Sequence, residues 1–132
     1  MVASVRIEVS PGELVDKLTI LEIKRERIAE PEKRANVEAE YALLCAALNA
    51  ELAAATRSPL DPLRAELKRV NARLWDIEDE IRDFDRRGDF GPPFVDLARS
   101  VYRTNDRRSE LKRAINALLG SKLIEEKSYR PY

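Results

Sequence analysis

The sequence predicts an all-α protein, a bundle of about four long antiparallel helices preceded by one short N-terminal strand. Three observations predict this fold: apolar residues recur at helical spacing along most of the 132 residues, only 4 residues are Gly, and 36% are charged. Few glycines and many charges are typical of long solvated helices rather than of a sheet protein rich in turns. A chain of this length usually forms one domain, so we expect a single helical domain over 1–132.

The strand is expected over residues 2–9. Val5, Ile7 and Val9 alternate with polar residues, which is the pattern of a strand with one buried face. No second strand follows, and a lone strand leaves its backbone N–H and C=O groups unpaired. The simplest partner is the same strand of a second copy, which predicts a homodimer. The alternative is that the strand lies unpaired along the helices.

The helices are expected over 11–29, 32–56, 60–87 and 93–119, with a tail over 121–132. Ser10 as N-cap, Pro11 at the first helical position and Glu13 two residues later form a capping box that begins the first helix. Pro31 disfavours helical geometry in the residue before it, and Gly88 and Gly120 end the last two helices. The third helix has the clearest apolar seam, formed by Leu60, Leu63, Leu67, Val70, Leu74, Ile77, Ile81 and Phe84.

Polar side chains form a second stripe on the first, third and fourth helices. In the first helix, Ile20 and Ile23 lie opposite the main apolar stripe beside charged residues, and a helix apolar on two faces is usually covered on both. If the three stripes meet, they enclose a hydrogen-bonding pocket floored by Trp75, the only tryptophan. Ion-pair ladders that fix helix register give the same pattern, so a structural interpretation stays open. The predicted ligand-binding residues are Glu13, Asp16, Lys17, Lys24, Asn71, Trp75, Glu78, Arg82, Tyr102, Asn105, Arg108, Lys112 and Asn116.

Composition excludes several kinds of chemistry. Lys plus Arg and Asp plus Glu are both 24, and this zero net charge disfavours nucleic acid as a partner. The absence of His excludes an imidazole base or ligand, and the single Cys45 excludes an intrachain disulfide and a cysteine zinc site. No metal and no cofactor are predicted for the favoured function, and a hard metal ion held by carboxylates stays open as an alternative. No segment approaches the ~18 apolar residues of a membrane span, and the stretch MVASVRIEVS has no continuous apolar region of the kind found in a signal peptide, so we expect a cytoplasmic protein.

Four blocks of sequence stand out together: GELVDKLTILEIK at 12–24, NARLWDIEDEIR at 71–82, YRTNDRRSELKRAIN at 102–116 and EEKSY at 125–129. They resemble the motifs of an uncharacterised family of short bacterial proteins. The resemblance implies a domain of unknown function whose members are sometimes encoded near glycosyltransferase and other surface-polysaccharide genes. Beyond the residues named above, the resemblance marks Glu22, Asp79, Asp106, Glu125, Lys127 and Tyr129 as motif positions.

Three functions stay open, and the sequence leaves undecided whether the chain is an enzyme. The favoured one is a non-catalytic binding or accessory module for an anionic or sugar-linked ligand. Its cations would be Lys17, Lys24, Arg82, Arg108 and Lys112, with Trp75 or Tyr102 against a ring.

The second function is a Mg-dependent enzyme that resembles the all-helical nucleotide pyrophosphohydrolases. Glu13 and Asp16 form an E-x-x-D turn and Glu78 and Asp79 an acidic pair, and carboxylate oxygens suit Mg²⁺. The order of these two blocks is the reverse of the order in that family. The third function is a structural, dimeric interaction protein, in which the polar stripes are subunit contacts.

Overall fold

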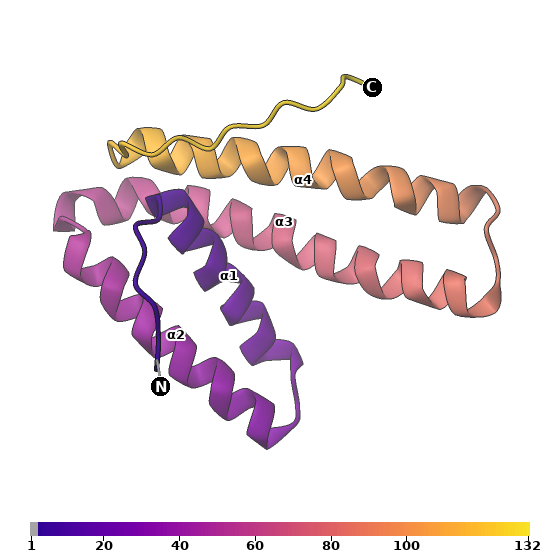
Figure 1. The fold of residues 1–132 in the computed structure, drawn as a ribbon, viewed down its shortest axis with the longest axis horizontal. Helices are drawn as coiled ribbons and strands as arrows, with labels where there is room; N and C mark the ends of the chain where they lie inside the picture. The colour runs from indigo at the N-terminus through magenta and orange to yellow at the C-terminus, as the bar shows by residue number, and fades with distance from the viewer. Residues whose placement is uncertain (1–2) are drawn as a thin grey trace.

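The computed structural model describes residues 3–132 and is a bundle of four helices (Figure 1). The helices are α1 Pro11–Arg27, α2 Pro31–Glu51, α3 Ala54–Arg87 and α4 Pro92–Leu118. The all-α bundle predicted from the apolar periodicity is confirmed. The first helix is central, because α1 packs against each of α2, α3 and α4, and α3 also packs against α4.

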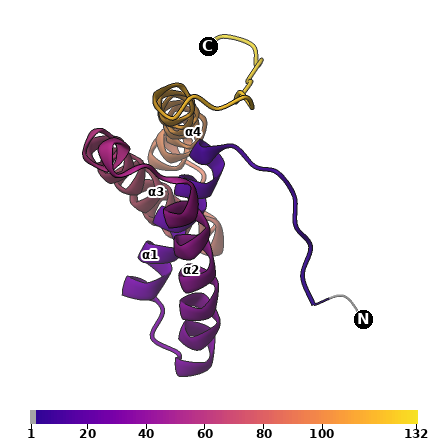
Figure 2. The same cartoon turned by 90° about the vertical axis from the view of Figure 1, so that its left-hand side faces the viewer.

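The predicted N-terminal strand is wrong. Residues 3–9 contain no strand, and Figure 2 shows this segment extending away from the helices rather than along them. Val5 is 78% exposed and Ile7 is 77% exposed. A strand exists through backbone hydrogen bonds to a neighbouring strand, and the described part of the single chain has none to offer. Residue 2, where the predicted range began, lies outside the described residues.

The core gathers around α1, whose apolar side chains are buried on more than one side. Leu18 and Ile23, which lie on different faces of α1, are 0% and 1% exposed. This follows from the packing of three helices around α1, and it agrees with the two apolar faces in the sequence. The main core cluster consists of Val15, Leu18, Leu48, Leu60, Leu67, Val70, Leu111 and Ile115.

The α3–α4 hairpin extends well beyond α1 (Figure 1). At 1.5 Å per residue, the 34 residues of α3 span about 50 Å, whereas the 17 residues of α1 span about half that length. Arg27, the last residue of α1, forms a hydrogen bond with Asp76 of α3. The part of α3 after Asp76 therefore continues past the end of α1 and is covered by α4 alone.

Two helix boundaries differ by five residues or more from those expected, and the others agree to within two residues. α2 ends at Glu51 instead of 56, and α3 begins at Ala54 instead of 60. The helix continues through Pro59 and Pro62, each of which removes one backbone donor without ending the helix. Gly88 ends α3 in the left-handed conformation, with φ 65°, as predicted. In residues 3–132, no helix has the length and apolarity that crossing a membrane requires.

Candidate functional site

The first turn of α1 is built directly against α4. Ser10 Oγ accepts a hydrogen bond of 3.1 Å from the Glu13 backbone N–H, which confirms the predicted N-cap. The Gly12 N–H donates to Asn116 Oδ1 of α4 at 2.7 Å. A Cβ at Gly12 would lie 2.5 Å from the Lys112 carbonyl oxygen, so this close approach of the two helices requires glycine.

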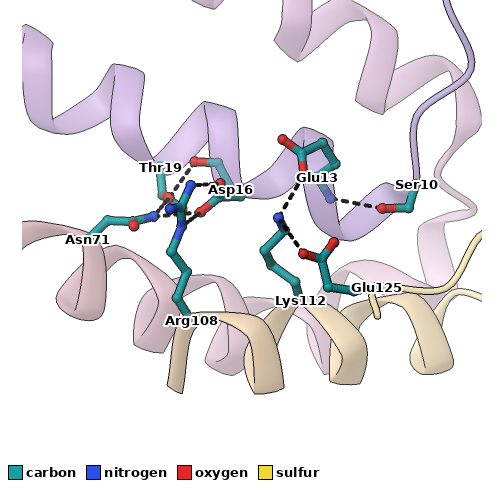
Figure 3. Close-up of polar contacts among 8 residues, drawn as sticks. All are labelled: Ser10, Glu13, Asp16, Thr19, Asn71, Arg108, Lys112 and Glu125. Carbon is teal, nitrogen blue, oxygen red and sulfur yellow. Dashed lines mark hydrogen bonds and ion pairs between the residues drawn. The ribbon is translucent and has the colours of Figure 1, made fainter. Parts of the chain in front are cut away.

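Lys112 lies beside this contact and joins three segments of the chain (Figure 3). Its ammonium lies 2.7 Å from Glu13 Oε2 of α1 and 3.2 Å from Glu125 Oε1 of the C-terminal tail. Burial lowers the pKa of Lys112, but the hydrogen bond and charge of Glu13, together with Glu125, outweigh burial, so its pKa is raised. The Glu13 carboxylate of the capping box thus pairs with Lys112, and it helps to hold the tail near α1.

One turn along α1, Asp16 is the centre of a second polar cluster. Its carboxylate accepts two hydrogen bonds from Arg108 of α4, at 2.9 Å and 2.5 Å, and one of 2.9 Å from Asn71 Nδ2 of α3. Asn71 Nδ2 also lies 2.9 Å from Thr19 Oγ1, which donates to the Asp16 carbonyl oxygen at 2.8 Å. Figure 3 shows the four side chains pointing toward one another from three helices.

The Asp16 cluster is closed rather than open to a ligand. Asp16 is 1% exposed, Thr19 0% and Asn71 5%. The hydrogen bond to Asp16 raises the pKa of Arg108, although burial opposes the effect. A buried polar network whose members satisfy one another fixes the relative positions of helices. The polar stripes of α1, α3 and α4 therefore converge here, as a network that joins the helices.

A further ion-pair network lies where α1, α2 and α3 meet. Glu22 of α1 accepts a hydrogen bond of 2.5 Å from Arg64 of α3, and Lys68 lies 3.6 Å from its other oxygen. Burial lowers the pKa of Arg64, but the hydrogen bond and charge of Glu22 outweigh it, so this pKa is raised. Tyr41 of α2 donates to Glu22 at 3.4 Å. These contacts join three helices and are consistent with a structural role.

An open groove lies beside these clusters, between α4 and the C-terminal tail. Figure 1 shows the tail, in yellow, turning back along α4. The groove has a volume of about 720 Å³, within the range of small-molecule sites. Lys127 of the tail lies 2.7 Å from Asp106 of α4, and the Tyr132 ring meets the Tyr102 ring at 4.8 Å. The lining residues are Val101, Tyr102, Asn105, Asp106, Arg108, Ser109, Lys112, Glu125, Glu126, Lys127, Tyr129, Arg130 and Tyr132.

The thirteen predicted site residues thus fall into separate places. The closed cluster contains Asp16, Asn71 and Arg108. The first turn of α1 is surrounded by Glu13, Lys112 and Asn116. The groove is lined by Tyr102 and Asn105, together with Arg108 and Lys112. Lys17 is exposed and Lys24 is half-buried.

Trp75, Glu78 and Arg82 do not line this groove. The Trp75 ring lies 5.8 Å from the Arg27 guanidinium at the end of α1. Glu78 and Arg82 form an exposed ion pair of 2.6 Å within α3. Trp75, Glu78 and Arg82 therefore do not form the enclosed pocket with an aromatic floor that the sequence predicted.

The acidic groups of the hydrolase hypothesis are engaged by cations and are spread along the bundle. Glu13 contacts Lys112, Asp16 contacts Arg108, and Glu78 contacts Arg82. In the described part of the chain, no three acidic or cysteine side chains gather into a group suited to a metal ion.

The chain matches one known family over nearly its whole length. Residues 5–131 match a family described as "Family of unknown function (DUF6165)". The chain belongs to the DUF6165 family. No curated protein and no solved structure matches it. The match covers α1 to α4 and nearly all of the tail of this DUF6165 member, so the Asp16 cluster and the groove both lie inside the family domain. The prediction that the chain is a domain of unknown function is thereby confirmed.

The sequence alone did not identify several residues of the polar clusters and the groove. Thr19 lies three residues after Asp16, a spacing that places both on the same helix face. This spacing could have identified Thr19 as a neighbour of Asp16. Gly12 gave no signal, because its role depends on how closely α4 approaches. Tyr132 and Arg130 of the groove lie in the tail, where the sequence has no periodic pattern to place them.

Proposed function

We propose that this DUF6165 protein is a non-catalytic ligand-binding module, and that the groove between α4 and the C-terminal tail is its binding site. The observation that carries the proposal is the mixed lining of a groove of about 720 Å³. Tyr102, Tyr129 and Tyr132 provide aromatic surface, while Asn105 and Ser109 provide amide and hydroxyl groups. Small-ligand sites typically combine apolar walls with a few polar groups that fix orientation.

Charge favours an anionic or sugar-linked ligand. Four cationic side chains line the groove, against three carboxylates. Arg108 and Lys112 hold their positions through Asp16, Glu13 and Glu125, so their remaining donors are preorganised without rearrangement. Tyrosine rings beside hydrogen-bonding groups suit a sugar ring. The surface-polysaccharide setting implied by the sequence resemblance agrees with a ligand of this kind.

The test is a thermal-shift screen of the purified chain with inorganic phosphate, sugar phosphates, nucleotide sugars and neutral oligosaccharides, followed by calorimetry on any hit. A ligand at about 100 times its Kd adds about 2.7 kcal/mol to the free energy of unfolding. We expect Asn105→Leu and Ser109→Ala to weaken that ligand's binding. Arg82→Ala changes an exposed residue outside the groove and serves as the matched control. A hit that binds Asn105→Leu and wild type equally would overturn the assignment of the groove, and a screen without hits would contradict the stated ligand class.

A second candidate function, that of a dimeric interaction protein, is favoured by one observation. The N-terminal segment presents Val5 and Ile7 to solvent, at 78% and 77% exposure, away from the helices (Figure 2). Exposed apolar side chains on an extended backbone are a surface that a second chain can cover. The molar mass of the full chain by light scattering tests this candidate, and a mass of one chain at all concentrations up to millimolar would contradict it.

A further inference from the structure

The N-terminal segment is chemically self-complementary. The sequence SVRIEVS, residues 4–10, has Ile7 at its centre. Moving outward from Ile7, each step reaches a matched pair: Arg6 and Glu8 are opposite charges, Val5 and Val9 are identical, and the ends are both serine. Two copies of this segment placed antiparallel across a two-fold axis at Ile7 would therefore bring each residue opposite a suitable one.

We infer that two chains dimerise by antiparallel backbone pairing of residues 5–9, with the two-fold axis at Ile7. In this register the partner's Val9 lies opposite Val5, and the partner's Ile7 lies opposite Ile7. The polar face brings the partner's Glu8 opposite Arg6. The pairing satisfies the backbone N–H and C=O groups of alternate residues, which in one chain have no strand to pair with in the described residues. The same surface of both copies is used, as a two-fold interface requires.

Charge selects this register among the alternatives. A parallel, in-register pairing would bring Arg6 of one copy beside Arg6 of the other, and Glu8 beside Glu8, and like charges directly opposite are unfavourable. A shift of one residue would turn the apolar side chains of one copy toward the polar face of the other. Glu8 also lies 3.3 Å from Lys122, but both side chains of this ion pair are highly exposed, so the contact is weak and leaves Glu8 accessible.

A groove beside the segment, lined mainly by apolar residues, supplies the cover that a two-stranded pairing needs. Two strands alone are marginally stable in water and require packing against another surface. A groove of about 620 Å³ lies at the base of the segment, and Val9 is one of its lining residues. Because the partner's Val5 lies opposite Val9, it is placed at this groove, and by symmetry each copy fills the groove of the other. The apolar lining residues are Val9, Pro11, Leu14, Leu48, Leu52, Ala53, Leu119 and Leu123.

This inference rests on the dimeric candidate and is independent of the ligand groove on α4. The first experiment measures dimerisation of the full chain by sedimentation equilibrium. We expect Arg6→Glu alone, or Glu8→Arg alone, to weaken the dimer by about tenfold or more, because each places like charges opposite each other twice. The double variant Arg6→Glu/Glu8→Arg restores the opposite charges and should return the dimer to within about threefold of wild type. Circular dichroism of each variant checks that the helices are intact.

The outcomes separate failure of the register from failure of the dimer. A monomeric wild-type chain would overturn both the register and the dimeric candidate. A dimer that both single reversals leave unchanged would overturn only the pairing at Ile7, because the copies would then meet through another surface. A double variant no better than the single ones would also overturn the pairing of Arg6 with Glu8.

A second experiment tests the position of the axis by disulfide formation in a Cys45→Ala background. Directly opposite residues of antiparallel strands have Cα atoms about 4.5–5.5 Å apart, within reach of a disulfide. Ile7→Cys should therefore link to itself rapidly under mild oxidation. Val5→Cys should not, because the two copies of this residue would lie about 14 Å apart. A mixture of Val5→Cys and Val9→Cys chains should give the mixed dimer, and equal self-linking by Val5→Cys and Ile7→Cys would overturn the register.

Discussion

Asp16 and Arg108 form a two-point ion pair between α1 and α4, with Arg108 Nε 2.9 Å from Asp16 Oδ1 and Nη2 2.5 Å from Oδ2. Asp16 is 1% exposed, so its charge depends on these two hydrogen bonds and on the one from Asn71. A buried carboxylate without its cation is strongly unfavourable, whereas an apolar pair of similar volume can replace a buried ion pair at little cost. The pair therefore holds the helices in register more than it adds net stability.

Removing one partner of this pair should destabilise the chain strongly. We expect Arg108→Met to lower the free energy of unfolding by about 3–5 kcal/mol, because it leaves the Asp16 carboxylate buried and unpaired. The double variant Asp16→Leu/Arg108→Met should lose less than Arg108→Met alone. Urea denaturation measures both values. Arg82→Ala, which removes an exposed ion pair, is the control and should change stability by no more than about 0.5 kcal/mol. Equal losses for Arg108→Met and Arg82→Ala would contradict the argument.

Gly12 is expected to tolerate no side chain. Gly12→Ala would place a Cβ 2.5 Å from the Lys112 carbonyl oxygen and 2.8 Å from Asn116 Oδ1, so α1 and α4 must separate. We expect a loss of about 1–3 kcal/mol in the free energy of unfolding, the usual cost of overpacking. Gly91→Ala is the matched control, because its Cβ would meet Asp89 Oδ1 at an ordinary 3.4 Å and its φ is −72°. Thermal and urea unfolding measure the stability of the two variants. Similar stability of both would show that α1 and α4 can separate at Gly12 at little cost.

The contrast between these residues shows how far the sequence could predict the site. Periodicity identified the residues that face inward, and Asp16, Asn71 and Arg108 do meet. Periodicity cannot state how far along a neighbouring helix contact continues. Because α1 is half as long as α3, Arg82 has the correct face but lies beyond the end of α1, in the exposed part of the hairpin.

The remaining differences have physical reasons as well. The alternation of Val5, Ile7 and Val9 predicted a strand. An alternating pattern shows that a segment favours an extended backbone, but it does not show that a second strand is present to pair with it. No strand forms in residues 3–132 of one chain. The tail forms one wall of the groove through specific contacts such as Lys127 with Asp106, which leave no periodic signal in the sequence.

Lys112 should contribute stability that is lost at alkaline pH. The ordinary lysine pKa is 10.5, and the net effect of Glu13, Glu125 and burial raises the pKa of Lys112 in the folded chain. A raised folded pKa means that the contribution is complete below the unfolded value and is lost as the pH rises through the folded value. We therefore expect the stability difference between wild type and Lys112→Met to stay constant from about pH 7 to 9. It should shrink above about pH 10.5.

Two controls accompany the alkaline measurement, which is urea denaturation at a series of pH values. Lys68, whose pKa is also raised, is present in both chains, so its titration cancels in the difference. Lys112→Arg keeps a positive charge to higher pH, and its difference from Lys112→Met should not shrink in this window. A wild-type advantage that is independent of pH up to about 11 would show that the lysine acts through its packing and not through its charge.

Asn71→Asp should lower the free energy of unfolding at neutral pH, and this loss should become smaller as the pH falls. Asn71 Nδ2 lies 2.9 Å from Asp16 Oδ1, so the substitution replaces a donor with a second carboxylate of the same shape. Two carboxylates at this distance repel each other, so the folded variant is stabilised when one shared proton binds between them. The variant's loss relative to wild type should therefore be largest near pH 7 and decrease as the pH falls toward about 4. Asn71→Leu loses the same hydrogen bonds without adding a charge, so its loss should not decrease in this way. Parallel pH profiles for the two variants, measured by urea denaturation, would mean that solvent reaches this cluster and screens the two carboxylates.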